Sequence, residues 1–432
     1  MIPAVIFCDP SVGSLKLGTL SLLDRLVVTL HRGGCRPIKI VCLGSLPALK
    51  RARALGCEIE VTRANPVITE RTLIAVCEVL VQTGDVKRLI ATNGRLIDSR
   101  GELLPIGTVT LEQAARCSSA GEGTEEGRGG ERCQTELLQA GCAPNREDGK
   151  PFLPLAKGEG RGEGESATVD SAFPLACNAA RVGNILKREQ GLRAVGIAER
   201  VIDFASARHA ERMLWKSLTS DTDGFVDVHF NRPLGRWLSK GLIHTPVTPN
   251  QVTLASMGIG LAGACLFARG DHAFNIWGAI LFQLSALVDC VDGDVARMVF
   301  KESPIGKWLD IGADQVVHVA VFGAIAYGAS RGVFAPQTWI LGGSAVLGVL
   351  LSFLVVLRGM LRSKDSPNPR LQKFLDKATT RDFSVLVLAL ACFDKLEWFL
   401  WLAAIGVHIF WVTALLIQSV GGEDDGSVER LP

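Results

Sequence analysis

Residues 289–314 read DCVDGDVARMVFKESPIGKWLDIGAD and place acidic side chains next to long apolar segments. Four aspartates of this stretch fall into two pairs: Asp289 with Asp292, and Asp310 with Asp314. The first pair is spaced i, i+3 and the second i, i+4, so each pair can project from one helix face. Ionised carboxylates at membrane depth are costly, and one arginine cannot neutralise four of them. The stretch therefore predicts two helices that hold cations between them, and oxygen ligands suit hard Mg²⁺ or Mn²⁺ ions.

Apolar residues dominate the chain beyond about residue 245. The whole chain of 432 residues is 48% hydrophobic, and its mean hydropathy of +0.27 is too high for an average soluble protein. Runs of nearly membrane-spanning length predict an all-α domain of six transmembrane helices. The expected spans cover residues 252–268, 273–288, 311–330, 338–356, 379–393 and 398–419. The fifth is short, and Asp394, Lys395 and Glu397 are expected to form the turn after it.

Basic residues predict the orientation of these spans, because they stay on the cytoplasmic side in short loops. Residues 358–381, between spans four and five, carry seven lysines and arginines, whereas the opposite loops offer mainly Arg269, Arg331 and Lys395. We therefore expect an integral protein of the cytoplasmic membrane with both termini and the active site in the cytosol. No cleavable signal peptide is expected, since residues 1–6 lack a basic n-region.

The first half predicts an α/β domain. Strand-like segments at 4–7, 38–44 and 58–61 alternate with helix-like segments at 22–34 and 46–56, the pattern of a parallel α/β layer. A stretch rich in Gly, Glu and Arg, 124–165, is expected to be a disordered and dispensable insertion. A helix at 198–218 and an amphipathic helix at 232–242, with Trp237 at the lipid interface, should follow. The expected domains are thus 1–225, cytosolic, and 226–425, in the membrane.

Composition also excludes some classes of function. Forty-six Lys and Arg nearly balance 44 Asp and Glu, so the formal charge of +2 gives no nucleic-acid-binding signature. Twelve scattered cysteines without a CxxC pair argue against a disulfide framework and a structural zinc site. We interpret them mostly as reduced packing thiols.

The motif D-x2-D-G-x2-A-R-x8-G-x3-D-x3-D, matched at all eight fixed positions, resembles the signature of the CDP-alcohol phosphatidyltransferase family, class I. The resemblance covers about residues 230–420, including TPNQVT at 248–253. It implies a transferase of phospholipid biosynthesis that moves a substituted phosphate from a CDP-linked donor, CDP-diacylglycerol or a CDP-alcohol, to an alcohol or phospho-alcohol acceptor and releases CMP. It also implies a homodimer. The motif does not identify the acceptor.

The resemblance carries roles to particular residues. It implies that Asp289, Asp292, Asp310 and Asp314 hold two Mg²⁺ or Mn²⁺ ions and that Asp314 is also the catalytic base. The residues implied to face the CDP moiety are Asn250, Thr253, Gly293, Arg297 and Ser303.

The first half resembles a nucleotidyltransferase of the inositol-phosphate cytidylyltransferase kind, with altered active-site segments. Where such enzymes have a Gly-rich basic loop, this chain has residues 7–16. Where they have a metal-binding Asp after a strand, this chain has residues 92–95, following the segment LIA. Asp203 matches a second acidic position, but one carboxylate is a poor metal site. A bifunctional protein, in which this half makes the CDP-alcohol, is the alternative. A cation transporter is disfavoured because no second set of broken helices appears.

Other polar residues near the motif have plainer interpretations. We expect Asp294 to be solvated or to cap a helix, His318 to be a core histidine and His244 an interface residue. Arg381 opens the fifth span on the same side as the motif, where binding of an acceptor phosphate is the alternative to a topology-setting charge.

Overall fold

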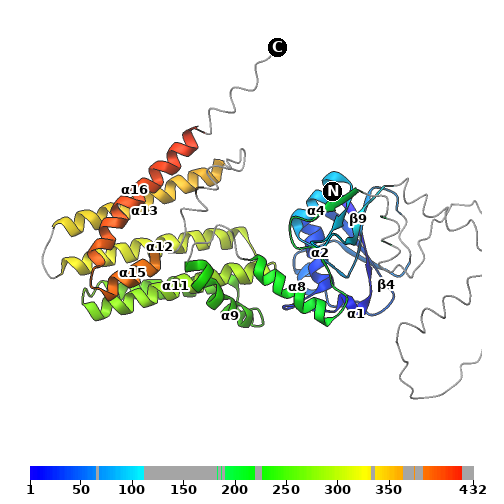
Figure 1. Cartoon of the computed structure of the whole chain (residues 1–432), viewed down its shortest axis with the longest axis horizontal. Coiled ribbons are helices and arrows are strands. Elements are labelled where there is room, and N and C mark those ends of the chain that lie inside the picture. Colours follow the sequence, from blue (N-terminus) through cyan, green and yellow to red (C-terminus); the bar gives the residue numbers. More distant parts are fainter. Residues whose placement is uncertain are drawn as a thin grey trace, which may run out of the picture. The chain divides into compact units, whose positions relative to one another are not determined.

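The structure is a computed structural model and describes residues 1–64, 68–110, 182, 186, 190–218, 226–331, 336–362, 374 and 383–420. It consists of two compact units, shown in Figure 1: Met1–Ser14 with Leu22–Ile202, here the α/β unit, and Leu15–Ser21 with Asp203–Pro432, here the membrane unit. The predicted insertion at 124–165 lies outside the described residues, as does Arg381.

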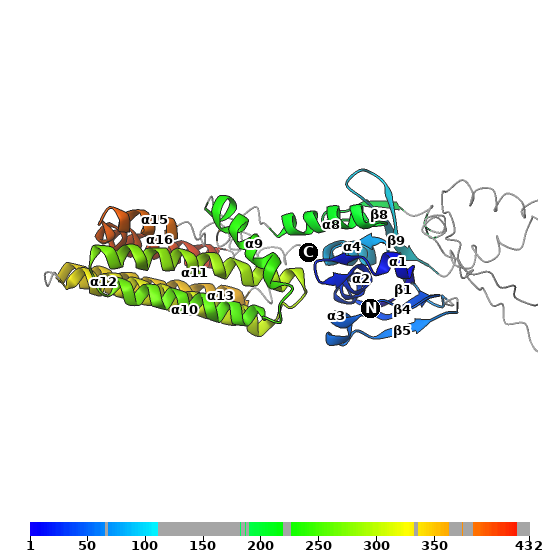
Figure 2. The same ribbon diagram turned by 90° about the horizontal axis from the view of Figure 1, so that it is seen from below.

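A seven-stranded sheet forms the centre of the α/β unit, in the order β10-β8-β9-β6-β1-β4-β5. The strands are β1 (Ile2–Cys8), β4 (Cys35–Cys42), β5 (Ile59–Thr62), β6 (Thr72–Val76), β8 (Gly94–Ile97), β9 (Leu103–Val109) and β10 (Gln190–Arg193). Strands β6, β1, β4 and β5 run parallel, and β9 runs antiparallel to β6 and β8. Figure 2 shows β1, β4 and β5 beside one another. The predicted parallel layer is confirmed.

Helices α1 (Pro10–Gly13), α2 (Leu22–Gly33), α3 (Lys50–Ala54) and α4 (Thr83–Thr92) connect these strands, with a short pair formed by β7 (Val79–Leu80) and β11 (Glu199–Arg200). Helix α2 buries nearly its whole length, including Asp24. The Asp24 carboxylate accepts hydrogen bonds from the amides of Arg51 and Ala52, 2.9 and 2.8 Å away, at the start of α3. This buried acid therefore fixes one helix against another.

Two expectations in this half were wrong. The segment LIA, residues 89–91, stands where the resemblance implied a strand, but it lies in the last turn of α4. Asn93 ends that helix in a left-handed conformation with φ 53°. The helix expected at 198–218 begins only at Phe204 as α8 (Phe204–Ser217), because Asp203 caps it and Glu199–Arg200 pairs as β11 with β7. Local capping groups explain both differences.

The cysteines at the ends of β1 and β4 are buried packing thiols, as predicted. Cys8, Cys35 and Cys42 carry no disulfide. Burial raises the pKa of Cys35 to about 12, so its thiol stays protonated at neutral pH.

The membrane unit contains a short hairpin, β2 (Lys16–Leu17) with β3 (Leu20–Ser21), and then helices. After α8 come η1 (Asp227–Asn231), α9 (Arg232–Leu242), α10 (Pro249–Phe267), α11 (His272–Met298), α12 (Pro304–Ser330), α13 (Pro336–Arg362), α15 (Phe383–Cys392) and α16 (Leu396–Val420). Among the described residues, five helices are long and apolar enough to cross a membrane: α10, α11, α12, α13 and α16. Helix α15 covers ten residues, so the sixth crossing stays a prediction.

Close helix packing builds the core of this unit. A Cβ atom on Gly263 of α10 would lie 2.9 Å from the carbonyl oxygen of Gly278 on α11, so glycine permits the backbones to approach. One buried apolar cluster joins α10 to α16, with Phe267, Phe282 and Leu400 among its members. This packing fixes where α11 and α12 present their polar ends.

Candidate active site

Helix α11 continues through the first half of the motif instead of ending at residue 288. Its 27 residues extend about 40 Å, more than the roughly 30 Å of a hydrocarbon core. A turn closed by the amide of Lys301, 2.8 Å from the carbonyl oxygen of Ala296, leads into α12. Ser303 caps α12 and Pro304 follows at its first position, which favours a helix start. The second half of the motif thus begins opposite the first.

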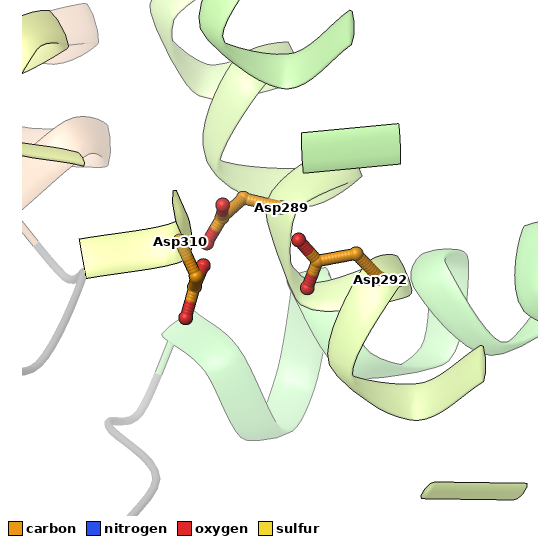
Figure 3. A group of neighbouring side chains, drawn as sticks. All are labelled: Asp289, Asp292 and Asp310. Atoms are coloured by element: carbon orange, nitrogen blue, oxygen red, sulfur yellow. The ribbon is translucent and has the colours of Figure 1, made fainter. Parts of the chain in front are cut away.

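Three aspartates converge from these two helices. One carboxylate oxygen from each of Asp289, Asp292 and Asp310 lies within 4.8 Å of the others. Figure 3 shows the carboxylates of Asp289 and Asp292, from α11, and of Asp310, from α12, around a common space. Asp289 is 5% and Asp292 7% exposed, and Asp310 is partly buried. Such closely spaced carboxylates repel one another without a cation, and three oxygen donors fit Mg²⁺ or Mn²⁺.

Asp314 lies one helical turn after Asp310 and is partly buried. It does not belong to the group of three, but it lines a cavity together with Asp289. The structure therefore places Asp314 beside the cluster, where a carboxylate can reach a group bound at the cluster's edge.

Thr253 is held against the cluster. The Thr248-Gln251 capping box starts α10, and Thr253 lies one turn further along that helix. Thr253 is 2% exposed, and its hydroxyl hydrogen-bonds to Oδ2 of Asp292. In this structure Thr253 orients a carboxylate, and the contact with CDP that the resemblance implies stays a prediction.

Asn250 and Ser303 meet at Gly306. Oδ1 of Asn250 lies 2.9 Å, and Oγ of Ser303 3.0 Å, from where a Cβ atom of Gly306 would be. Ser303 Oγ also accepts the amide of Gly306 at 2.9 Å. A larger residue at 306 would displace both polar side chains, so the motif's second glycine keeps the starts of α10 and α12 together.

Asp294 is neither solvated nor a cap, and that expectation was wrong. It is 1% exposed, and its Oδ1 accepts from Arg232 at 2.7 Å and from Arg297 at 3.1 Å. Arg297 itself lies over Gly293, where a Cβ atom would come within 3.4 Å of its guanidinium. Desolvation favours such pairing, because an isolated buried carboxylate is costly. Asp294 thus orients Arg297 and joins α11 to α9.

His318 is partly buried and lies among aromatic rings, which supports the expected packing role. Its ring centroid is 5.3 Å from that of Phe383 and 6.2 Å from that of Phe322. It nevertheless lines the same cavity as Asp314. His244 is exposed at the end of α9.

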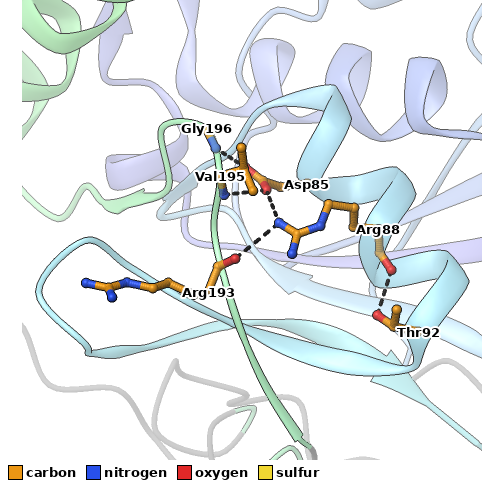
Figure 4. A network of polar contacts seen from close by, with 6 residues as sticks. All are labelled: Asp85, Arg88, Thr92, Arg193, Val195 and Gly196. Atoms are coloured by element: carbon orange, nitrogen blue, oxygen red, sulfur yellow. Dashed lines mark hydrogen bonds and ion pairs between the residues drawn. The ribbon is translucent and has the colours of Figure 1, made fainter.

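Three acids of the first half of the chain have structural contacts. Asp9 caps α1 by accepting from Ser11, and Asp203 caps α8 by accepting from Ser206. The hydrogen bond from the Ser206 hydroxyl, with that from its amide, lowers the pKa of Asp203. Asp85, 2% exposed, accepts from the amides of Val195 and Gly196 at 2.9 and 3.0 Å, as Figure 4 shows. These carboxylates therefore accept hydrogen bonds that hold helix starts and loops in place.

Sequence reasoning missed Asp227, Asn231, Gln283 and Ser384, which form a hydrogen-bonded chain near the cluster. A signal was present, because Gln283 is a polar residue within an apolar span, and such residues normally have a partner.

Comparison with known proteins supports the assignment of this region. Residues 246–415 match the family model described as CDP-alcohol phosphatidyltransferase. A bifunctional IPC transferase and DIPP synthase of Rubrobacter xylanophilus is 32% identical over 183 residues, 42% of this chain and 39% of that protein. A phosphatidylinositol phosphate synthase of Corynebacterium glutamicum is 38% identical over 103 residues, 24% of this chain and 46% of that protein. The chain thus matches less than half the length of each relative.

Among solved structures, a phosphatidylinositol phosphate synthase of Mycobacterium tuberculosis with CDP-DAG bound is 20% identical, with a TM-score of 0.32. The similarity covers 44% of this chain and 92% of that one. The residues that match the family model lie in the membrane unit and include the whole aspartate motif.

Proposed function

We propose that this protein is a membrane transferase that moves a substituted phosphate from a CDP-linked donor to an alcohol and releases CMP. The observation that carries the proposal is the convergence of Asp289, Asp292 and Asp310 from two helices of a region that matches the family model. A relative named phosphatidylinositol phosphate synthase favours an inositol phosphate as the first acceptor to test, and CDP-diacylglycerol is the first donor to test with it.

The metal site follows from the same group. Asp289, Asp292 and Asp310, joined by Asp314, would hold two Mg²⁺ or Mn²⁺ ions. When bound, these ions would neutralise the diphosphate and stabilise CMP as the leaving group. Thr253 orients Asp292, and the Asp294 ion pair orients Arg297 toward the donor's phosphates.

Asp314 acts as the base in this proposal. Its carboxylate takes the proton of the acceptor hydroxyl, the hydroxyl oxygen attacks the β-phosphorus, and the bond from that phosphorus to the CMP oxygen breaks. The products are a phosphodiester and CMP. The position of Asp314 on a cavity shared with Asp289 supports this role.

The CDP moiety would be contacted by Asn250, Gly293 and Ser303, since Asn250 and Ser303 meet at Gly306 and Gly293 leaves space beside Arg297.

We also propose that the chain crosses the membrane six times, with both termini and the active site in the cytosol. We further propose that it forms a homodimer and that its two domains divide near residue 225. The asymmetry of basic residues between loops supports the orientation.

Release of CMP tests the proposal. Purified full chain with CDP-diacylglycerol, an inositol phosphate and Mg²⁺ should release CMP and form a lipid of matching mass, and EDTA should stop both. Absence of CMP release with every donor and acceptor offered would reject the proposal.

A second candidate is a bifunctional enzyme whose α/β unit makes the CDP-alcohol, favoured by the name of the Rubrobacter relative. The capping roles of Asp9 and Asp203 argue against it. Consumption of CTP by the full chain, with CDP-alcohol formation, would support this candidate.

A further inference from the structure

A chain of hydrogen bonds between mostly buried side chains links three segments of the membrane unit. Ser384 Oγ on α15 donates to Gln283 Oε1 on α11 at 2.7 Å, and Gln283 Nε2 donates to Asn231 Oδ1 at 2.9 Å. Asn231 Nδ2 then donates to Asp227 Oδ1 at 2.7 Å. Ser384 is 2%, Asn231 1% and Asp227 7% exposed. The chain therefore runs within the protein interior.

The carboxylate at one end fixes the direction of every bond. Asn231 turns its amide nitrogen toward the Asp227 carboxylate and its oxygen toward Gln283. Gln283 must then present its nitrogen to Asn231 and its oxygen to Ser384. Ser384 is left as the donor, so its single hydroxyl proton points into the chain.

At its other end the chain reaches the cavity that Asp289 and Asp314 line. Ser384 and Ser285 line this cavity as well, and Ser285 Oγ donates to the carbonyl oxygen of Ser256 at 2.7 Å. Both serine protons are thus directed at protein atoms. The cavity volume of about 20 Å³ holds roughly one water-sized group.

We propose that Ser384 is a specificity-determining residue for the acceptor: its oxygen accepts a hydrogen bond from a second hydroxyl of a polyhydroxylated acceptor. This inference rests on the proposed function, in which the reacting hydroxyl lies between the carboxylate cluster and Asp314. Gln283, Asn231 and Asp227 are positioning residues that keep the Ser384 proton out of the cavity.

A neutral hydroxyl fits this cavity better than charged groups do. A fully ionised phosphate carries no proton, so it cannot donate a hydrogen bond to the Ser384 oxygen. An ammonium group carries three donors and, once desolvated, needs a carboxylate partner, whereas these carboxylates are assigned to the metals and the reacting proton. A hydroxyl supplies one proton in the space of one water.

Binding measurements on the purified full chain test this assignment without requiring turnover. The probes are myo-inositol 1-phosphate and its monodeoxy analogues, titrated calorimetrically with Mg²⁺ and CMP present. The wild-type chain should bind at least one monodeoxy analogue about 3- to 10-fold more weakly, the contribution of one hydrogen bond. Ser384→Ala should bind the parent compound more weakly by the same factor and no longer discriminate against that analogue.

Three further variants separate specificity from structure. Ser384→Thr, which retains a hydroxyl, should bind like the wild type within about 2-fold. Gln283→Met should weaken acceptor binding as Ser384→Ala does, with CDP-diacylglycerol binding unchanged. Ser352→Ala is the matched control, since its hydroxyl donates to the carbonyl oxygen of Val407 at 3.4 Å and does not line the cavity. It should bind both substrates normally.

The assignment would be overturned if Ser384→Ala still discriminated between the parent compound and that analogue as the wild type does. It would also be overturned if the variant lost acceptor and donor binding equally. A wild-type chain that binds no inositol probe but releases CMP with another alcohol would overturn it too and leave the proposed reaction standing. Conversely, the expected binding pattern without any CMP release would reject the reaction and keep Ser384 as a hydroxyl-binding residue.

Discussion

The two units use buried or locally bonded aspartates in opposite ways. In the α/β unit, Asp24 and Asp85 accept two backbone amides each and so fasten one segment to another. In the membrane unit, Asp289, Asp292 and Asp310 gather their oxygens within 4.8 Å. Acids surrounded by amide donors are satisfied by the fold, whereas acids gathered on one another need a cation. This contrast, more than burial, separates structural acids from candidates for chemistry.

Removing a ligand of the acidic group should have the largest effect on activity. Asp289→Asn replaces an anionic ligand by a neutral one and should lower CMP release by roughly 10³-fold, since metal stabilisation of transition-state charge amounts to several kcal/mol. Donor binding should weaken as well, and high Mg²⁺ should restore part of the activity. A variant with normal metal dependence would show that Asp289 is not a metal ligand.

Asp314→Asn should lower turnover by about 10²-fold, the usual contribution of a positioned general base. Donor affinity should change much less, because the amide keeps the shape and one ligating oxygen. Steady-state kinetics with varied donor, together with donor-binding measurements, check this split. If donor binding falls as far as in Asp289→Asn while the bound fraction turns over normally, Asp314 is only a ligand.

Replacing Asp294 should lower the stability of the membrane unit. Asp294→Leu leaves Arg232, whose side chain is 11% exposed, without its carboxylate partner and should destabilise the membrane unit by about 3 kcal/mol. The paired variant Arg232→Leu with Asp294→Leu should recover much of that loss. Thermal unfolding of the three proteins measures both effects, and equal melting temperatures for single and paired variants would contradict the ion-pair account.

Asp85 should give the smallest effect on transfer. Asp85→Ala removes the acceptor for two backbone amides and should destabilise the α/β unit by about 2 kcal/mol. CMP release by the folded fraction should remain within about 2-fold of the wild type. A parallel loss of turnover in the folded fraction would show that the α/β unit takes part in the reaction.

Periodicity and spacing predicted much of this architecture. The motif predicted that two helices would bring acids together, and the structure shows Asp289, Asp292 and Asp310 doing so. The amphipathic helix expected at 232–242 is α9, with Trp237 81% exposed. Such features depend on local patterns that one helix face carries by itself.

Contacts between distant segments were not predictable in the same way. Asp294 pairs with Arg232, 62 residues away, and Ser384 bonds to Gln283, 101 residues away. Only the packing of α9, α11 and α15 decides which polar groups meet. The LIA segment shows the converse error, because a short apolar run fits a strand and a helix equally well.

CMP release by a matched set of aspartate variants tests the central claim most directly. Asp310→Asn changes the acidic group, while Asp9→Asn and Asp203→Asn change exposed helix caps of the first half of the chain. With CDP-diacylglycerol, an inositol phosphate and Mg²⁺, we predict that Asp310→Asn nearly abolishes CMP release and that the two cap variants retain it. Normal release by Asp310→Asn, with loss in either cap variant, would contradict the account.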